Sequence, residues 1–432
     1  MDKKLLTKLL GIVVLTASLL LPLRLIEEQI VNRGRFQKQV TTEIAQSVAS
    51  AQTLTGPVLA IRYRVKTLAG ATRERIFPLA AERLDITGKA SVEQRYRGIY
   101  RARLYHMEMT LDGDFNLPAD LLPLPRENEQ IEASVVLLMG ISDLDGLSSD
   151  PEVNINNRPF RFKAPEDKTF DAILPGNRLE MKLGQLTPGQ AQRLKFDFPL
   201  RLTGTETFSI APTAGSNHIQ LQSAWRHPSF QGRLPDEREE ISAKGFTANW
   251  KISRLNRPLE RILQAHSAGT RGRDVVSVNF MDPVNIYLQS ERAVKYGILF
   301  IALTFAAFFL GETLRRHPMH LMQYLLAGLA LAVFFLLLVA LSEHIDFLYA
   351  YLVAAVGCIG LIVFYLSGAL GGWLPAFAFG AGLSSLYGIL YGLLQSEDNA
   401  LLMGSLLIFA ALAAIMISTR KLDWNRLNHA PA

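Results

Sequence analysis

The sequence has little cysteine and, in its last third, little charge. Cys358 is the single cysteine among 432 residues, so no disulfide can form within one chain and cysteine usage does not indicate a compartment. Between Tyr296 and Thr419 the charged residues are confined to three short polar clusters. A hydrocarbon core about 30 Å thick is crossed by about 20 apolar helical residues. This stretch therefore predicts several membrane-spanning helices.

Motifs for specific chemistry are also lacking. The sequence contains no G-x-S-x-G nucleophile motif and no Gly-rich phosphate-binding loop that ends in Lys and Ser or Thr. It also offers no specific Ser/Lys or Cys/His arrangement for nucleophilic hydrolysis. These absences favour a protein that is not an enzyme, and we expect no catalytic residue, no cofactor and no bound metal.

The distribution of charge does not indicate a nucleic-acid partner. The formal net charge is +6, but Lys and Arg are interspersed with Asp and Glu and form no long basic block. We therefore expect a solvated surface with basic residues flanking the membrane segments. The lipid bilayer is a predicted partner, and nucleic acid is not.

The N-terminus resembles the start of a secretory signal, because lysines precede an uncharged stretch from Leu9 to Leu23. A cleavable signal should end in small residues, whereas this stretch ends in leucines and a proline. We therefore predict an uncleaved anchor. It can extend from Leu5 to Ile26 if the side chains of Lys8 and Arg24 reach toward the headgroups.

The pattern of apolar and polar residues changes from Gly56 onward. Segments such as VLAIRYRVKTL and NHIQLQSAW alternate apolar and polar residues, as half-buried strands do, and are bounded by turn residues. The pair Asp112-Gly113 reads as a turn within this region, and the best helical signal spans Arg257 to His266. We predict a large β sandwich that buries alternate side chains.

Polar clusters and turn residues divide the C-terminal apolar stretch into five spans. A 50-residue stretch without charged residues is too long for one crossing, and the segment from Ser367 to Pro375 supplies Gly and Pro breakers near its middle. With the N-terminal anchor, the predicted total is six spans. The predicted C-terminal spans are 296–314, 321–342, the two parts of 347–396 on either side of that turn, and 399–419.

The orientation follows from Lys and Arg in short loops, which tend to remain in the cytoplasm. Three groups of basic residues flank the predicted spans, and all three can be cytoplasmic only if the middle domain lies on the opposite side of the membrane. The loops that would then face outward contain Glu and Asp without Lys or Arg. We predict that both termini are cytoplasmic. The basic groups are Lys3, Lys4 and Lys8; Arg315 and Arg316; and Arg420, Lys421 and Arg426.

These observations predict a mixed membrane protein. A β-rich, sandwich-like extracytoplasmic domain is inserted between an N-terminal transmembrane helix and a five-helix C-terminal transmembrane bundle. The predicted boundaries are 1–27 for the anchor, 28–292 for the β-rich domain, 293–420 for the bundle and 421–432 for a cytoplasmic tail.

Glu312 is the most suggestive ionisable residue, because a carboxylate at membrane depth is costly unless it is paired. Arg315 and Arg316 follow three and four residues later on the same helical face, so we predict an intramembrane ion pair with Glu312. A structural anchor is the favoured role over a transport site. None of the predicted spans has a centrally placed charge.

A second candidate site lies in the predicted outer domain. Trp225, His227 and Phe230 lie close together in the segment WRHPSFQG, where they would form either a partner-binding edge or the packing of a turn. Packing is the favoured interpretation.

Two clusters of ionisable residues lie at the ends of predicted spans. His317 and His320 have helical spacing for a metal, but Pro318 interrupts the helix, and an interfacial loop is favoured. A proton-handling cluster of Glu343, His344 and Asp346 is likewise less favoured than a solvated loop.

Three long blocks of the sequence are distinctive: Leu221 to Trp250, Glu291 to Glu312 and His317 to His344. They closely resemble the CreD family of inner-membrane proteins, and the resemblance covers almost the whole chain. It implies a bacterial inner-membrane protein associated with the Cre two-component regulatory system, with cell-envelope integrity and with tolerance to colicin E2. It brings no catalytic residue or cofactor with it.

Three hypotheses of function follow. The favoured one is a non-enzymatic envelope protein whose periplasmic domain binds an unknown envelope component or protein partner. The alternative is a small-solute transporter or channel formed by the C-terminal bundle. The third is an enzyme acting on a lipid or peptidoglycan precursor, which would require Glu343, His344 and Asp398 to converge in a pocket.

Overall fold

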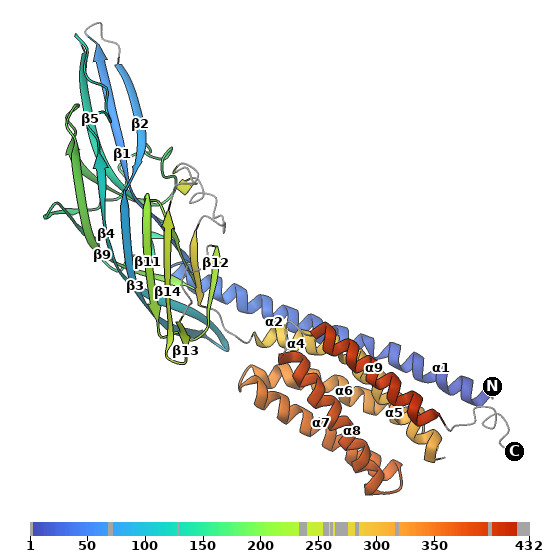
Figure 1. Ribbon diagram of the computed structural model, residues 1–432. Helices are drawn as coiled ribbons and strands as arrows, with labels where there is room; N and C mark the ends of the chain where they lie inside the picture. The colour runs from blue at the N-terminus through green and yellow to red at the C-terminus, as the bar shows by residue number, and fades with distance from the viewer. Residues whose placement is uncertain are drawn as a thin grey trace. The chain divides into compact units, whose positions relative to one another are not determined.

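The computed structural model resolves the chain into two compact units (Figure 1). One unit, here the helical unit, combines Met1–Gln37 with Val284–Ala432, and the other, the β unit, is Lys38–Pro283. The predicted fold class is confirmed, with an N-terminal apolar helix, a central β-rich domain and C-terminal apolar helices. The structure describes residues 3–67, 72–127, 129–232, 240–253, 259, 262–263, 275–280, 285–315, 319–395 and 400–420.

Sheet A of the β unit has the strand order β12-β15-β10-β1-β5-β8, and β2 pairs antiparallel with the later part of β1. The first strand, β1, pairs in parallel with β10 through its first residues and antiparallel with β5 along most of its length. The bounds are β1 Gln52–Thr67, β2 Thr72–Ala80, β5 Glu129–Ile141, β8 Arg178–Gln185, β10 Thr207–Ala211, β12 Pro228–Gly232 and β15 Val276–Phe280.

Sheet B has the order β13-β14-β11-β3-β4-β9-β6-β7. Its centre is the long antiparallel pair of β3 and β4, which a two-residue turn joins between Arg97 and Tyr100. A short 3-10 helix, η1 (Leu144–Gly146), follows β5. The bounds are β3 Arg83–Arg97, β4 Tyr100–Leu117, β6 Glu152–Ile155, β7 Arg158–Arg161, β9 Gln192–Thr205, β11 Ser216–Ser223, β13 Glu240–Ser242 and β14 Gly245–Ser253.

The two sheets share one hydrophobic core. Leu59 and Ile61 of sheet A and Leu84 and Ile86 of sheet B are buried in the same cluster, and Trp250 of β14 is fully buried there. Each fully buried aliphatic or aromatic side chain of this kind contributes about 1.5–3 kcal/mol relative to exposure. The alternation seen in the sequence is therefore the alternation between this core and the outer faces of the sheets.

A second hydrophobic cluster covers the outer face of sheet A. Phe170, Ile173 and Leu174 pack there on β1 and β5 together with Leu259 and Leu263. Residues 259, 262 and 263 are helical, within the helix predicted from Arg257 to His266, and the other residues of that prediction lie outside the described part of the chain.

The turn predicted at Asp112-Gly113 is wrong, because β4 runs through both residues without a break. A Cβ atom at Gly113 would lie within 3 Å of the carbonyl oxygen of Arg83 and of the Phe196 ring. The glycine therefore serves close packing between β3, β4 and the aromatic core rather than a change of direction.

The helical unit consists of long apolar helices. Among the described residues, four helical segments are long and apolar enough to cross a membrane: Leu6–Ser47, which combines α1 and α2, Leu321–Ser342, Phe347–Ala369 and Trp373–Gln395. A fifth candidate is the pair of α4 and α5, which is bent by 41°. The segment Leu402–Ile417 is apolar but shorter. The bounds are α1 Lys3–Ser18, α2 Leu20–Ser47, α4 Ile286–Lys295, α5 Gly297–Arg315, α6 Leu321–Ser342, α7 Phe347–Ala369, α8 Trp373–Gln395 and α9 Ala400–Thr419.

Candidate functional site

An ion pair joins the first helix to the C-terminal helices. The ammonium group of Lys8 in α1 contacts the Oε1 atom of Glu312 in α5, and both side chains are largely buried, with exposed fractions of 21% and 14%. The Lys8 ammonium also donates to the carbonyl oxygen of Met319 at 2.7 Å. Two segments more than 300 residues apart in sequence are thus held together by a charged contact.

Tyr324 of α6 completes this cluster, which we call the Lys8 cluster. Its hydroxyl donates to the Oε2 atom of Glu312 at 3.2 Å, and the Lys8 ammonium lies 6.0 Å from the centre of its ring. Each oxygen of the Glu312 carboxylate therefore has a partner. A largely buried carboxylate requires such compensation, because removing its hydration costs several kcal/mol.

The predicted ion pair of Glu312 with Arg315 and Arg316 stays a prediction. Arg316 and the side chain of Arg315 lie outside the described residues. The structure adds Lys8 and Tyr324 as partners of Glu312, which the sequence pattern did not indicate. The only signal available was complementary charge at the edges of two apolar segments, and charge alone does not indicate which segments meet.

A second polar cluster, the Glu343 cluster, lies at the opposite end of α6. The Tyr287 hydroxyl in α4 donates to the Oε1 atom of Glu343 at 3.1 Å, and the Nε atom of Arg33 in α2 lies 3.8 Å from the same oxygen. The Glu343 side chain is 8% exposed. Helix α6 has 22 residues and is therefore about 33 Å long, close to the thickness of a hydrocarbon core.

The two clusters thus lie at the two ends of one membrane-length helix. Both bring a basic residue of the N-terminal helices to an acidic residue of the C-terminal helices. Charged groups at helix ends can reach the headgroup region, where their cost is smaller than at the membrane centre. This arrangement suits fixed attachment of the N-terminal helices to the bundle.

Trp225, His227 and Phe230 have different surroundings in the β unit. Phe230 is half-buried and packs edge-on against Trp250 and Phe246 of the core, with ring centres 5.8 and 5.6 Å away. The Trp225 indole donates to the carbonyl oxygen of His227 at 3.1 Å, and the His227 side chain is exposed. Their role as a partner-binding edge or as packing stays a prediction.

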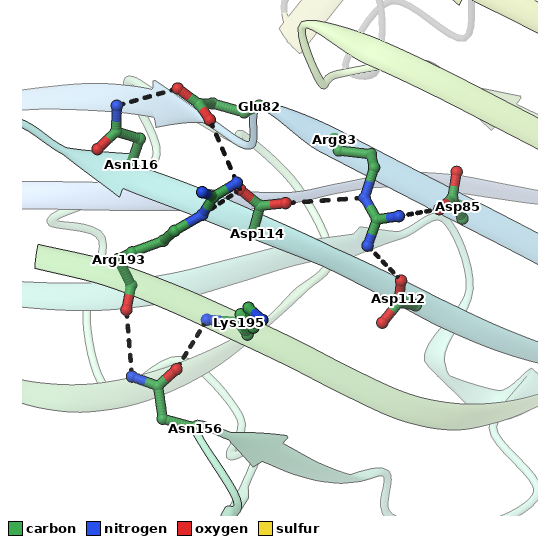
Figure 2. A network of polar contacts seen from close by, with 9 residues as sticks. All are labelled: Glu82, Arg83, Asp85, Asp112, Asp114, Asn116, Asn156, Arg193 and Lys195. Atoms are coloured by element: carbon green, nitrogen blue, oxygen red, sulfur yellow. Dashed lines mark hydrogen bonds and ion pairs between the residues drawn. The ribbon is translucent and has the colours of Figure 1, made fainter.

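A polar network crosses β3, β4 and β9 on sheet B (Figure 2). The buried carboxylate of Asp114 accepts hydrogen bonds from Arg193 at 2.7 and 3.0 Å, which raise the pKa of the arginine. Arg83 lies between Asp114, Asp112 and Asp85, at distances of 3.7, 2.9 and 3.1 Å. The arginines offset repulsion between aspartates on neighbouring strands, which favours a structural role.

A buried arginine anchors the segment before β8. The Arg178 side chain is 2% exposed and donates to Glu180 at 2.8 Å and Asp171 at 2.5 Å. It also donates to the carbonyl oxygens of Asp167 and Leu174. These bonds satisfy the guanidinium inside the protein, as burial of a charge requires.

A depression of about 390 Å³ lies beside this arginine on the outer face of sheet A. Its lining includes Arg62, Glu166, Glu180 and Lys182. The hydrogen bond from Lys182 lowers the pKa of the Glu166 carboxyl, so this pair is charged at neutral pH. Arg62 is paired with Glu74. Glu180 is paired with Arg178, so each of these four lining charges has a partner of opposite charge.

The structure describes only some of the other ionisable candidates from the sequence. His320 caps α6, where its Nδ1 atom accepts from the backbone N–H of Met322 at 3.2 Å. His317 and Asp398 lie outside the described residues. Within the described part of the chain, no three His, Cys, Asp or Glu side chains are arranged to hold a metal ion.

The fold and these contacts define a membrane protein that carries one large β-rich domain between apolar helices. The family model described as inner membrane protein CreD matches residues 4–425. The chain is 37% identical to the inner membrane protein CreD of Escherichia coli (strain K12), and the match covers 97% of this chain and 92% of that protein. The chain therefore belongs to the CreD family of inner membrane proteins.

Solved structures show only remote similarity to the chain. An M1 zinc metallopeptidase from Deinococcus radiodurans matches with 9% identity and a TM-score of 0.21, over 46% of this chain and 42% of the peptidase chain. A candidate nutrient-binding protein from Legionella pneumophila matches with 8% identity and a TM-score of 0.25, over 59% and 79%. TM-scores this low support no statement about the fold or function of this chain.

Proposed function

We propose that the chain is a non-enzymatic inner-membrane protein that supports cell-envelope integrity by binding an envelope component or a protein partner through its β unit. In this proposal the protein has six spans, both termini are cytoplasmic and the β unit is periplasmic. By family resemblance it acts under the Cre two-component system and is linked to colicin E2 tolerance. The domain limits are those expected from the sequence, 28–292 for the periplasmic domain and 293–420 for the bundle.

The observation that carries the proposal is the pair of polar clusters at the ends of α6. Lys8 with Glu312 and Arg33 with Glu343 attach the N-terminal helices to the C-terminal helices at both ends of a membrane-length segment. This supports one membrane unit built from both ends of the chain. The β unit, inserted between them in the sequence, is the largest part of the protein available to a partner outside the membrane.

The proposed topology is tested with single cysteines in a Cys358→Ser background. A cysteine replacing Gln192, which is exposed on β9, should react with a membrane-impermeant maleimide in cells with a permeable outer membrane. A cysteine added after Ala432 should react only once the inner membrane is also permeabilised. The opposite pattern would place the β unit in the cytoplasm.

The proposed binding function is tested by photo-crosslinking in living cells. A photoreactive residue at His218 or Gln222, both exposed on β11, should capture a defined partner, and one at Gln192 serves as the control. Deletion of the gene in a strain without a paralogue should increase sensitivity to envelope stress. Unchanged sensitivity under inducing conditions would contradict the proposal.

The alternative of a transporter or channel is tested with purified protein in liposomes. It rests on the buried charges of the Lys8 cluster and on Tyr387, which donates to Cys358 inside the bundle at 3.4 Å. A transporter should move a solute across the liposome membrane, and Glu312→Gln should change the flux. The proposed scaffold predicts no flux in either protein.

A further inference from the structure

We propose that one end of the β unit binds the headgroup surface of an anionic phospholipid bilayer. The surface consists of the β3–β4 ribbon, Glu93 to Arg103, and the adjoining loop, Ala224 to His227. The inference goes beyond the proposed function and does not depend on which side of the membrane the β unit occupies.

The β3–β4 ribbon extends past the strands on both of its sides. Pairing of β3 with β11 ends at Ala90, and pairing of β4 with β9 ends at Leu104. Pairing within the ribbon continues to Arg97 and Tyr100. A two-stranded ribbon is marginally stable in water by itself, so this one requires support from other parts of the protein or from a surface.

Part of that support comes from the end of helix α2. Ile44 packs with Ala102 and Leu104, and Glu43 pairs with Arg97 at 2.5 Å. These contacts cover part of one face of the ribbon, at Ala102 and Leu104 near its base and at Arg97 near its turn. They do not cover Tyr96, which is 66% exposed, or Ile99, which is 38% exposed at the turn.

The tip of the ribbon combines aromatic, aliphatic and basic residues. Its sequence from Glu93 to Arg101 is EQRYRGIYR, with three arginines against one glutamate. The side chains of Arg95 and Arg97 are each 63% exposed, and the ion pairs that they form with Glu93 and Glu43 lie at the surface, where such pairs are weak. Tyrosine is favoured at the level of lipid headgroups, and arginine is attracted to anionic lipids.

The loop after β11 adds residues of the same kind. The Arg103 guanidinium lies 5.7 Å from the centre of the Trp225 ring, which places this loop against the base of the ribbon. Arg226 and His227, which follow Trp225, are exposed. The surface therefore has an aromatic and basic character in two segments that are distant in sequence.

Chain connectivity argues for lipid as the occupant. Arg103 donates to the carbonyl oxygen of Phe280, the last residue of β15. The chain continues from Phe280 toward helix α4, which begins at Ile286. Helix α2, the other connection to the apolar helices, packs on the ribbon through Ile44. Both connections thus leave the β unit beside the proposed surface.

The test uses the full-length protein with Cys358→Ser in vesicles of phosphatidylcholine with 30% phosphatidylglycerol. Tyr96→Cys is labelled with an environment-sensitive fluorophore, and Gln192→Cys, at the opposite end of sheet B, is the matched control. We expect a blue-shifted emission at position 96 and at least about twofold stronger quenching there by lipids that carry a nitroxide near the headgroup. Equal emission and quenching at the two positions would overturn the proposal.

Charge variants test the requirement for anionic lipid. Arg95→Gln with Arg97→Gln should reduce quenching at position 96, whereas Arg73→Gln with Arg75→Gln on β2 should not. Quenching that is as strong in pure phosphatidylcholine would also overturn the proposal, since contact would then not require anionic headgroups. The Tyr96→Cys protein should retain the thermal stability of the Gln192→Cys protein, which excludes misfolding as the cause of a difference.

Discussion

At the scale of single residues, Tyr105 shows how the β unit satisfies a polar group in its core. The tyrosine is fully buried, its hydroxyl donates to the carbonyl oxygen of Thr207 at 2.8 Å, and it accepts from the backbone N–H of Gln52 at 3.1 Å. Burial raises the pKa of this hydroxyl above its usual value, with a smaller opposing effect of the Gln52 bond. The side chain is therefore neutral in the folded protein at neutral and moderately alkaline pH.

We predict that Tyr105→Phe lowers the free energy of unfolding by about 1–3 kcal/mol at pH 7, because two buried backbone groups lose a partner. Tyrosine in the unfolded chain ionises near pH 10, while the raised pKa keeps it neutral in the folded chain. The stability that Tyr105 contributes is thus complete below pH 10 and declines above it. Denaturant unfolding of both proteins between pH 7 and 11 should show a difference that narrows at alkaline pH, and a constant difference would contradict this.

At the scale of elements, the contribution of an ion pair to stability depends on its burial. The buried Arg178 side chain pairs with Asp171 in the segment before β8 and with Glu180 in β8, and so joins that segment to the strand. Arg161 pairs with Glu152 at 3.5 Å on β7 and β6, where its side chain is 75% exposed. The first contact fixes the segment that covers sheet A, whereas the second is screened by water.

Arg178→Met should therefore destabilise the protein by about 3–5 kcal/mol, since it leaves the Glu180 carboxylate buried without its partner. Arg161→Met is the matched control, with an expected change within about 0.5 kcal/mol. Chemical denaturation followed by tryptophan fluorescence measures both. Equal effects of the two substitutions would show that burial of Arg178 does not determine its contribution.

At the scale of the whole molecule, the ends of the chain cooperate in the helical unit. The Lys8 cluster joins α1, α5 and α6, and the Glu343 cluster joins α2, α4 and α6. Helix α6 takes part in both clusters. The N-terminal helices are accordingly part of the bundle and not only a tether.

A charge exchange tests this attachment. Lys8→Glu and Glu312→Lys should each lower the thermal unfolding temperature in detergent, because each places like charges together in a largely buried site. The double exchange restores a pair of opposite charges and should recover at least half of the loss in unfolding temperature. Lys3 and Lys4 keep the N-terminus basic in all three variants. Additive losses in the double variant would indicate that the two residues do not interact.

Sequence patterns predicted the features that depend on neighbouring residues. Apolar runs indicated the helices, and alternation indicated strands such as β1 and β11, because both signals repeat along a segment. The contact of Lys8 with Glu312 and the strand order of the sheets depend on which distant segments meet, which periodicity does not encode. Gly113 shows a related error, since a glycine that permits close packing has the same local sequence as one that permits a turn.

The position of β10 between β1 and β15 has a consequence for biosynthesis. Strand β1 pairs with β10, which is synthesised about 150 residues later. The other edge of β10 pairs with β15, which is complete only once Phe280 has left the ribosome. Pairings so distant in sequence form slowly and leave strand edges open meanwhile. We therefore expect the β unit to need protection by chaperones until translation has reached the helices that follow it.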